Sequence, residues 1–202
     1  MFWIDTVAYE HSDGRLRRLY DRVAGPGHNV DNIMMMHSLR PHGMEGHMAL
    51  YKSVLHHNGN TVPKWFLETL GVWVSVLNKC AYCVDHHFVG LGRLLGDETK
   101  AAAIRAALDS GAIEQGPFAE REIRALRYAE ALSRDPASVN EAMIVGLREA
   151  GYDDDEILEI NQITAYFAYA NRTVLGLGCS TEGDELGLSP GRSDDPDDWS
   201  HG

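Results

Sequence analysis

Apolar residues recur at intervals of three and four positions along most of the chain, the spacing that gives a helix one apolar face. Capping residues precede many of these stretches, and glycine or proline often follows them. The pattern predicts helices over residues 12–25, 32–40, 44–57, 64–78, 80–96, 97–111, 118–135, 138–151 and 153–178. Strict alternation of apolar and polar residues is scarce, so we expect an all-α fold.

The two ends of the chain depart from this pattern. The opening stretch FWIDTVAY indicates either an extended arm packed on a neighbouring subunit or a terminus packed on its own chain. Residues 186–202 are rich in proline, glycine and aspartate and have little to bury, which is typical of a disordered acidic tail. We therefore expect a single all-helical domain over residues 1–185, followed by that tail.

Composition narrows the class of protein. The chain has 202 residues, 44% of them hydrophobic, which is enough for one domain with a substantial core. With a formal net charge of -12 there is no basic stripe to meet phosphates, so nucleic acid is not an expected partner. The N-terminus has no signal-peptide pattern, and no apolar run approaches the ~20 residues that span a bilayer. We expect a cytoplasmic protein without a membrane partner.

The stretch NKCAYCVDHH, residues 78–87, contains two cysteines followed at once by two histidines. At 100° per residue, Cys80, Cys83 and His87 fall within about 60° of one another on a helical wheel. His86 lies off that stripe. His87 is therefore the histidine expected to serve the cysteines.

The polar pair Asn78-Lys79 separates two apolar helical stretches, which predicts an antiparallel helical hairpin. Glu68 lies ten residues before Asn78 and His87 eight after Lys79, so the two side chains are expected roughly level with each other. A carboxylate at Glu68 would hold the imidazole of His87 in one tautomer and orientation. This is the arrangement of nucleophile, base and orienting group.

The cysteine pair suits redox chemistry. A thiolate is the nucleophilic form of cysteine, and a helix N-terminus, a Cys-x-x-Cys partner and a neighbouring imidazole all favour it. A sulfenic acid formed on one cysteine can condense with the other into a disulfide. Three cysteines in total are too few for a disulfide framework, so the pair indicates catalysis or metal binding.

Glu68, Cys80, Cys83 and His87 together spell E-x11-C-x2-C-x3-H. This spacing resembles the core motif of the AhpD-like alkyl hydroperoxidases, within the carboxymuconolactone decarboxylase family. The all-helical layout is similar to that of the larger peroxidase-related members. The decarboxylase branch lacks the cysteine pair, so its presence argues against lactone decarboxylation.

The resemblance implies an AhpD-like helical bundle that forms homo-oligomers, as dimers, trimers or hexamers. It implies that Cys83 is the peroxidatic cysteine, Cys80 the resolving one, and Glu68 and His87 the proton relay. Well-studied members carry a histidine between the two cysteines, and this chain has Tyr82 there, which we take as a candidate relay group.

Three functions stay open. The favoured one is a cysteine-dependent peroxidase with a hydroperoxide substrate, a dithiol protein or small thiol as electron donor, and no cofactor or metal. The second is a thiol–disulfide oxidoreductase that acts on proteins or small disulfides. The third is a non-enzymatic helical oligomer, either redox-sensing or stabilised by zinc. Its candidate zinc ligands are Cys80, Cys83, His87 and Cys179.

Several further residues have less specific interpretations. The apolar neighbours Val84, Phe88 and Trp73 favour an organic hydroperoxide over hydrogen peroxide. Cys179 is expected to be an unpaired structural thiol. Six upstream histidines lack a close pair on one face, so we expect packing or surface roles, with one at a pocket entrance as an alternative. They are His28, His37, His42, His47, His56 and His57.

Overall fold

The computed structural model describes residues 2–195 and 197–199. Its helices are α1 (Gly14–Val23), α2 (Asn32–Met35), α3 (Pro41–Tyr51), α4 (Lys64–Leu77), α5 (Ala81–Leu95), α6 (Glu98–Ser110), α7 (Glu120–Arg134), α8 (Glu141–Glu149) and α9 (Asp154–Gly176). The described residues contain no β-strand, only an isolated bridge between His57 and Ser193. The all-α fold expected from the sequence is confirmed.

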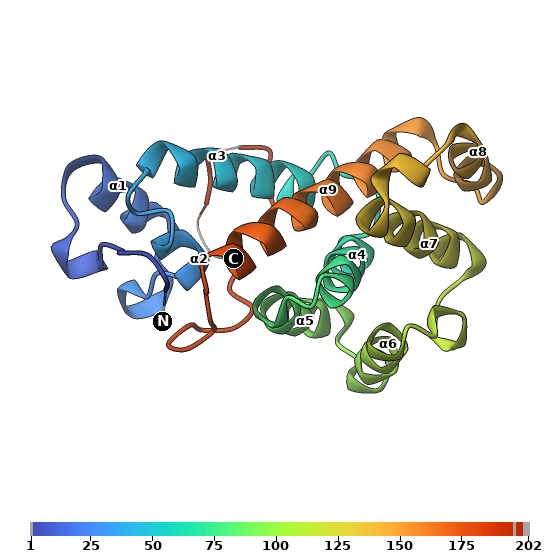
Figure 1. The fold of residues 1–202 in the computed structure, drawn as a ribbon, viewed down its shortest axis with the longest axis horizontal. Helices are drawn as coiled ribbons and strands as arrows, with labels where there is room; N and C mark the ends of the chain where they lie inside the picture. The colour runs from blue at the N-terminus through green and yellow to red at the C-terminus, as the bar shows by residue number, and fades with distance from the viewer. Residues whose placement is uncertain (1, 196, 200–202) are drawn as a thin grey trace.

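The α4–α5 hairpin lies at the centre of the molecule, with α9 and α7 packed on α4 (Figure 1). Ten of the residues of α4 are buried, so this helix is enclosed on nearly all sides. The hairpin turns at Lys79, whose φ of 59° lies in the left-handed region. Cys80 then caps the N-terminus of α5.

The predicted helix over residues 32–40 is shorter in the structure, because α2 ends at Met35 and Pro41 opens α3. Proline suits that first helical position because its missing N–H would have no partner there. After Tyr51 the helix widens into a π-helical segment, Lys52–His56. The segment buries Lys52 and His56 as well as two apolar side chains, so the extra residue in the turn brings polar groups inward.

The opening segment packs on its own chain, one of the two arrangements expected from the sequence. The backbone N–H of Trp3 donates to the carbonyl of Leu177, and Val7 N–H donates to Ser38 Oγ. Helices α1 to α3 form a second apolar cluster beside the main core, and Trp199 from the C-terminal segment is part of it.

The C-terminal segment differs from the disordered tail expected over residues 186–202. Its described residues, 186–195 and 197–199, lie against the rest of the chain, and Trp199 is only 3% exposed. Lys52 Nζ donates to the carbonyl of Gly191, and Arg22 pairs with Asp197. The segment is held in place because Trp199 packs into the apolar cluster of α1 to α3 and the carbonyl of Gly191 accepts a hydrogen bond from Lys52. Residues 196 and 200–202 lie outside the described residues.

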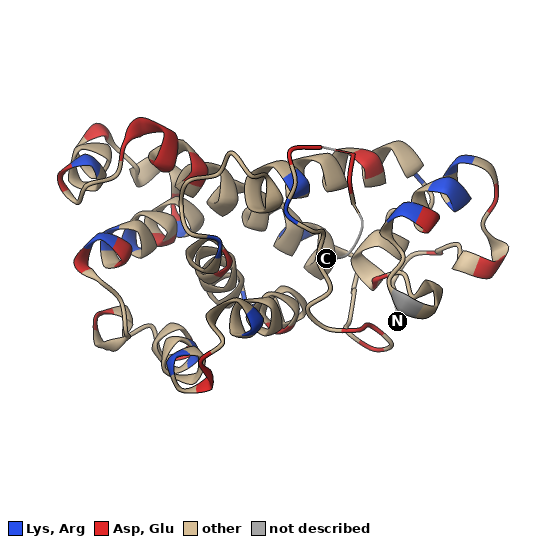
Figure 2. Ribbon diagram, turned by 180° about the vertical axis from the view of Figure 1, so that it is seen from behind, with Lys and Arg blue, Asp and Glu red and all other residues tan. Residues whose placement is uncertain are grey.

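Charged residues are distributed over the whole ribbon. In Figure 2 the lysines and arginines are interspersed with acidic residues, and acidic positions are frequent along the C-terminal segment. In the part of the chain that the structure describes, no helix combines the length and apolarity that crossing a bilayer requires.

The close packing of α4 on α9 gives a first prediction. A Cβ at Gly71 would lie 2.3 Å from Cε2 of Phe167, so Gly71→Ala forces the two helices apart. We expect it to lower the free energy of unfolding by about 1–3 kcal/mol, as measured by chemical denaturation. Gly46→Ala is the matched control, because its Cβ would meet nothing within 4 Å. It should leave stability unchanged or raise it by up to about 1 kcal/mol. Equal effects of the two changes would contradict the packing.

Candidate active site

A buried hydrogen bond links the two helices of the hairpin. Nδ1 of His87, on α5, lies 2.8 Å from Oε2 of Glu68, on α4. The Glu68 side chain is 3% exposed and that of His87 14% exposed. The contact agrees with the level placement expected from their spacing. Because Nδ1–H donates to the carboxylate, Nε2 is the ring nitrogen left to accept a proton.

The two cysteines lie at the beginning of α5 and are both buried and reduced. They come within 3.5 Å of each other. The hydrogen bond from the Cys83 thiol lowers the pKa of Cys80, and the same bond, with burial, raises the pKa of Cys83. Because its pKa is raised, Cys83 must lose its proton before it can attack.

Asn171, on α9, supports the cysteine pair. Its side chain donates to Ser75 Oγ and accepts from the amide of Asn78, both on the α4 side of the hairpin. Its hydrogen bonds to the cysteines also help to lower the pKa of both thiols. In the structure Asn171 lies behind the cysteines.

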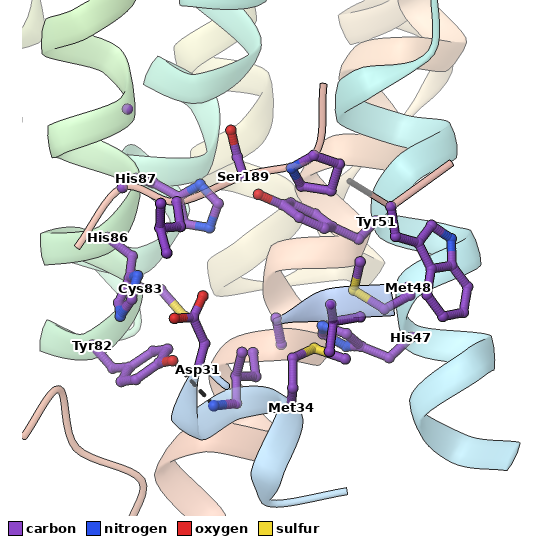
Figure 3. A pocket seen from close by; sticks show the side chains of 18 of the residues that line it. Asp31, Met34, His47, Met48, Tyr51, Tyr82, Cys83, His86, His87 and Ser189 are labelled. Atoms are coloured by element: carbon purple, nitrogen blue, oxygen red, sulfur yellow. Dashed lines mark hydrogen bonds between the residues drawn. The ribbon is translucent and has the colours of Figure 1, made fainter. Parts of the chain in front are cut away.

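A cavity of about 60 Å³ adjoins the pair (Figure 3). Cys83, His87 and Glu68 line it, whereas Cys80 does not. The opposite walls come from the N-terminal helices and from the C-terminal segment. Their apolar members are Val23, Ile33, Met34, Met48, Leu188, Pro190 and Trp199. A small molecule in this cavity therefore meets the sulfur of Cys83 and not that of Cys80.

Tyr82, the residue between the cysteines, also lines the cavity. Its hydroxyl donates to Oδ2 of Asp184 at 2.8 Å and accepts from the Ile33 N–H at 3.1 Å. Burial, with the nearby Asp184 and Asp31, raises its pKa well above 10. The hydroxyl is thus held by Asp184 and Ile33 rather than by a cysteine, which leaves the relay role of Tyr82 a prediction.

A second polar group consists of His86 and Asp31, which line the cavity, and of Asp184 behind them. Nε2 of His86 lies 3.1 Å from Oδ2 of Asp184. Oδ1 of Asp31 is buried and has no hydrogen-bond partner among the described residues. Burial raises the pKa of Asp31 to about 7, against the opposing effect of His86. No sequence pattern indicated this group, because its members converge only when the segments that carry Asp31 and Asp184 fold onto α5.

Of the upstream histidines, His47 is the one that lines the cavity. Burial lowers its pKa to about 3, so it is neutral at physiological pH. It packs among the rings of His37, Tyr51 and Tyr166. Among the described residues, no three His, Cys, Asp or Glu side chains are grouped closely enough to hold a metal ion.

Solved structures share this fold. A peroxidase-related protein with an alkylhydroperoxidase AhpD core from Ralstonia eutropha JMP134 superposes with a TM-score of 0.76 at 22% identity, covering 89% of this chain and 92% of that one. A peroxidase-related protein from Silicibacter sp. TM1040 gives 0.73 at 22% identity, covering 91% and 92%. The debrominase Bmp8 gives 0.69 at 18% identity, covering 87% and 90%.

No protein-family model and no curated protein matches the sequence. The structural similarity defines the class: this chain has the all-α AhpD-like fold of peroxidase-related proteins. The resemblance first seen in the E-x11-C-x2-C-x3-H spacing and the fold found here agree.

The buried carboxyl of Asp31 gives a second prediction. Between its unfolded pKa near 3.8 and its folded pKa of about 7, the folded protein binds more protons than the unfolded chain. Stability therefore falls as pH rises through this window. Asp31→Asn should raise the free energy of unfolding at pH 8 by roughly 1–3 kcal/mol and change it little at pH 4.

Urea denaturation at the two pH values measures this effect. Asp5→Asn, at an exposed position, controls for the substitution itself. A variant that is less stable than the wild type at pH 8 would show that the ionised carboxylate has a favourable partner.

Proposed function

We propose that this protein is a cysteine-dependent peroxidase that reduces organic hydroperoxides. The observation that carries the proposal is the position of Cys83. It is the member of the cysteine pair that lines the cavity, and the Glu68–His87 pair lines the same cavity. Two solved structures of peroxidase-related proteins share this fold and support the assignment to this class of enzyme.

The proposed reaction begins with loss of the Cys83 proton to Nε2 of His87, whose protonated ring Glu68 stabilises. The Cys83 thiolate attacks the terminal oxygen of R–O–OH, and the O–O bond breaks. The departing alkoxide takes a proton and leaves as ROH, while Cys83 becomes a sulfenic acid. Cys80 then loses its proton and attacks the Cys83 sulfur, and the displaced hydroxide takes up that proton and leaves as water. An external dithiol reduces the resulting disulfide by exchange.

The lining of the cavity favours an organic hydroperoxide. Met34, Met48 and Trp199 offer an apolar surface to an alkyl or aryl group. The residues from which the sequence analysis inferred this preference do not line the cavity. They are Val84, Phe88 and Trp73. The preference for an organic hydroperoxide is unchanged, but the apolar residues that support it lie on the wall opposite the cysteines.

Burial of the cysteines favours a peroxidase over an oxidoreductase for protein disulfides. Cys80 is 0% and Cys83 2% exposed, so in this conformation a molecule must fit the cavity to reach Cys83, and exchange with a protein disulfide or a protein dithiol requires the site to open. A small hydroperoxide needs only the cavity. The dithiol donor and the homo-oligomer expected from the sequence remain parts of the proposal. Bmp8 has the same fold and is a debrominase, so the fold alone does not select the substrate.

Turnover of tert-butyl hydroperoxide with dithiothreitol as reductant tests the proposal. The wild type should consume the peroxide catalytically, and Cys83→Ser should fall to the uncatalysed background. Cys179→Ser is the matched control, because Cys179 does not line the cavity, and its rate should stay within about twofold of the wild type.

The same assay with a brominated pyrrole separates the two activities of the shared fold. Debromination of the pyrrole without any consumption of hydroperoxide would contradict the proposed function. So would a Cys83→Ser variant that turns over as fast as the wild type.

A further inference from the structure

Tyr51 is the residue around which the wall opposite the cysteines is built. It ends α3, immediately before the π-helical segment Lys52–His56. Its ring stacks on Tyr166 with centroids 5.5 Å apart and meets the edges of His56 at 4.7 Å and His87 at 6.0 Å. Packing on three sides fixes the direction of the ring.

The hydroxyl of Tyr51 makes no hydrogen bond with any described residue, although the residue lines the cavity. Several other tyrosine hydroxyls near the core do have partners. Tyr20 donates to the carbonyl of Val7, Tyr82 donates to Asp184, and Tyr128 accepts from Asn161. Tyr51 is partly buried and its hydroxyl has no such partner among the described residues, so it is available to a ligand in the cavity.

The direction of this hydroxyl is toward the reacting groups. In Figure 3 the ring of Tyr51 extends across the cavity and its oxygen points toward His87. Burial, and then nearby groups that include Glu68 and Cys83, raise the pKa of Tyr51 well above 10. Tyr51 therefore stays protonated and is a hydrogen-bond donor throughout the reaction.

Several other candidate donors in the cavity are already engaged. The hydroxyl of Tyr82 donates to Asp184, and His86 faces the same carboxylate. The hydroxyl of Tyr166 lies 3.4 Å from Nε2 of His47. His87 takes up the proton of Cys83 in the proposed function. Ser189 and His47 also line the cavity, and Tyr51 is the uncharged donor whose hydroxyl points toward His87 in Figure 3.

We propose that the Tyr51 hydroxyl binds the substrate oxygen that leaves as alkoxide when Cys83 attacks the peroxide. This inference rests on the proposed function and adds one group to it. As the O–O bond breaks, negative charge develops on the oxygen bonded to carbon, and a positioned donor stabilises that charge. The hydrogen bond keeps its proton on Tyr51, so the proton that completes ROH comes from the protonated imidazole of His87.

The test compares leaving groups of different basicity. In Tyr51→Phe, oxidation of Cys83 by tert-butyl hydroperoxide should slow by about 100-fold, since removal of one such donor has effects of that order. Oxidation by peracetic acid should slow by no more than about threefold, because its acetate leaving group needs little stabilisation. Alkylation of Cys83 by iodoacetamide, which releases iodide, should be unchanged.

Tyr128→Phe is the control, because it removes a buried hydroxyl, partnered by Asn161, away from the cavity. Its rates with all three reagents should equal those of the wild type. The inference is overturned if Tyr51→Phe reacts with tert-butyl hydroperoxide as fast as the wild type. An equal loss with all three reagents would overturn it as well, because that pattern indicates a structural role. A wild type that is alkylated but never oxidised would instead overturn the proposed function itself.

Discussion

The hydrogen bond between Glu68 and His87 is the constraint on which the rest of the site depends. A carboxylate that is almost fully buried is costly unless a partner compensates it, and His87 is that partner. To meet, the two side chains need α4 and α5 to lie antiparallel and in one register. That register places Cys80 at the beginning of α5 and Cys83 one turn before His87.

Three distant parts of the chain complete the cavity around this hairpin. The residue before α2 supplies Asp31, helix α3 supplies Tyr51, and the C-terminal segment supplies Leu188 and Pro190. The two outer parts are tied together by polar contacts, such as Asn32 N–H donating to Asp184 and Lys52 donating to Gly191. The hairpin thus provides the reacting thiol, while the two ends of the chain shape the space for the substrate.

The hairpin and its pair were predictable because they depend on short-range rules. Helical periodicity placed Cys80, Cys83 and His87 on one stripe, and the polar break at Asn78-Lys79 fixed where the chain reverses. The sequence spacing then sufficed to bring Glu68 level with His87. The geometry within one hairpin does not depend on the rest of the fold.

The wall opposite the cysteines was not predictable, because it depends on contacts between residues far apart in the sequence. Asp31 and Asp184 are 153 positions apart by their numbering, and nothing local in either stretch indicates that both face α5. The π-helical segment that follows Tyr51 reflects burial of Lys52 and His56, which helical periodicity does not report. Composition suggested a disordered C-terminal segment, whereas burial of Trp199 depends on a cluster formed by α1 to α3.

The most direct test of the account is to locate the first oxygen transferred from a hydroperoxide. Cys80→Ser protein would be treated with one equivalent of tert-butyl hydroperoxide in the presence of dimedone, which traps sulfenic acids, and the peptides identified by mass spectrometry. The account predicts the adduct on Cys83, because that sulfur lines the cavity beside His87. An adduct confined to Cys179, with Cys83 unmodified, would contradict it.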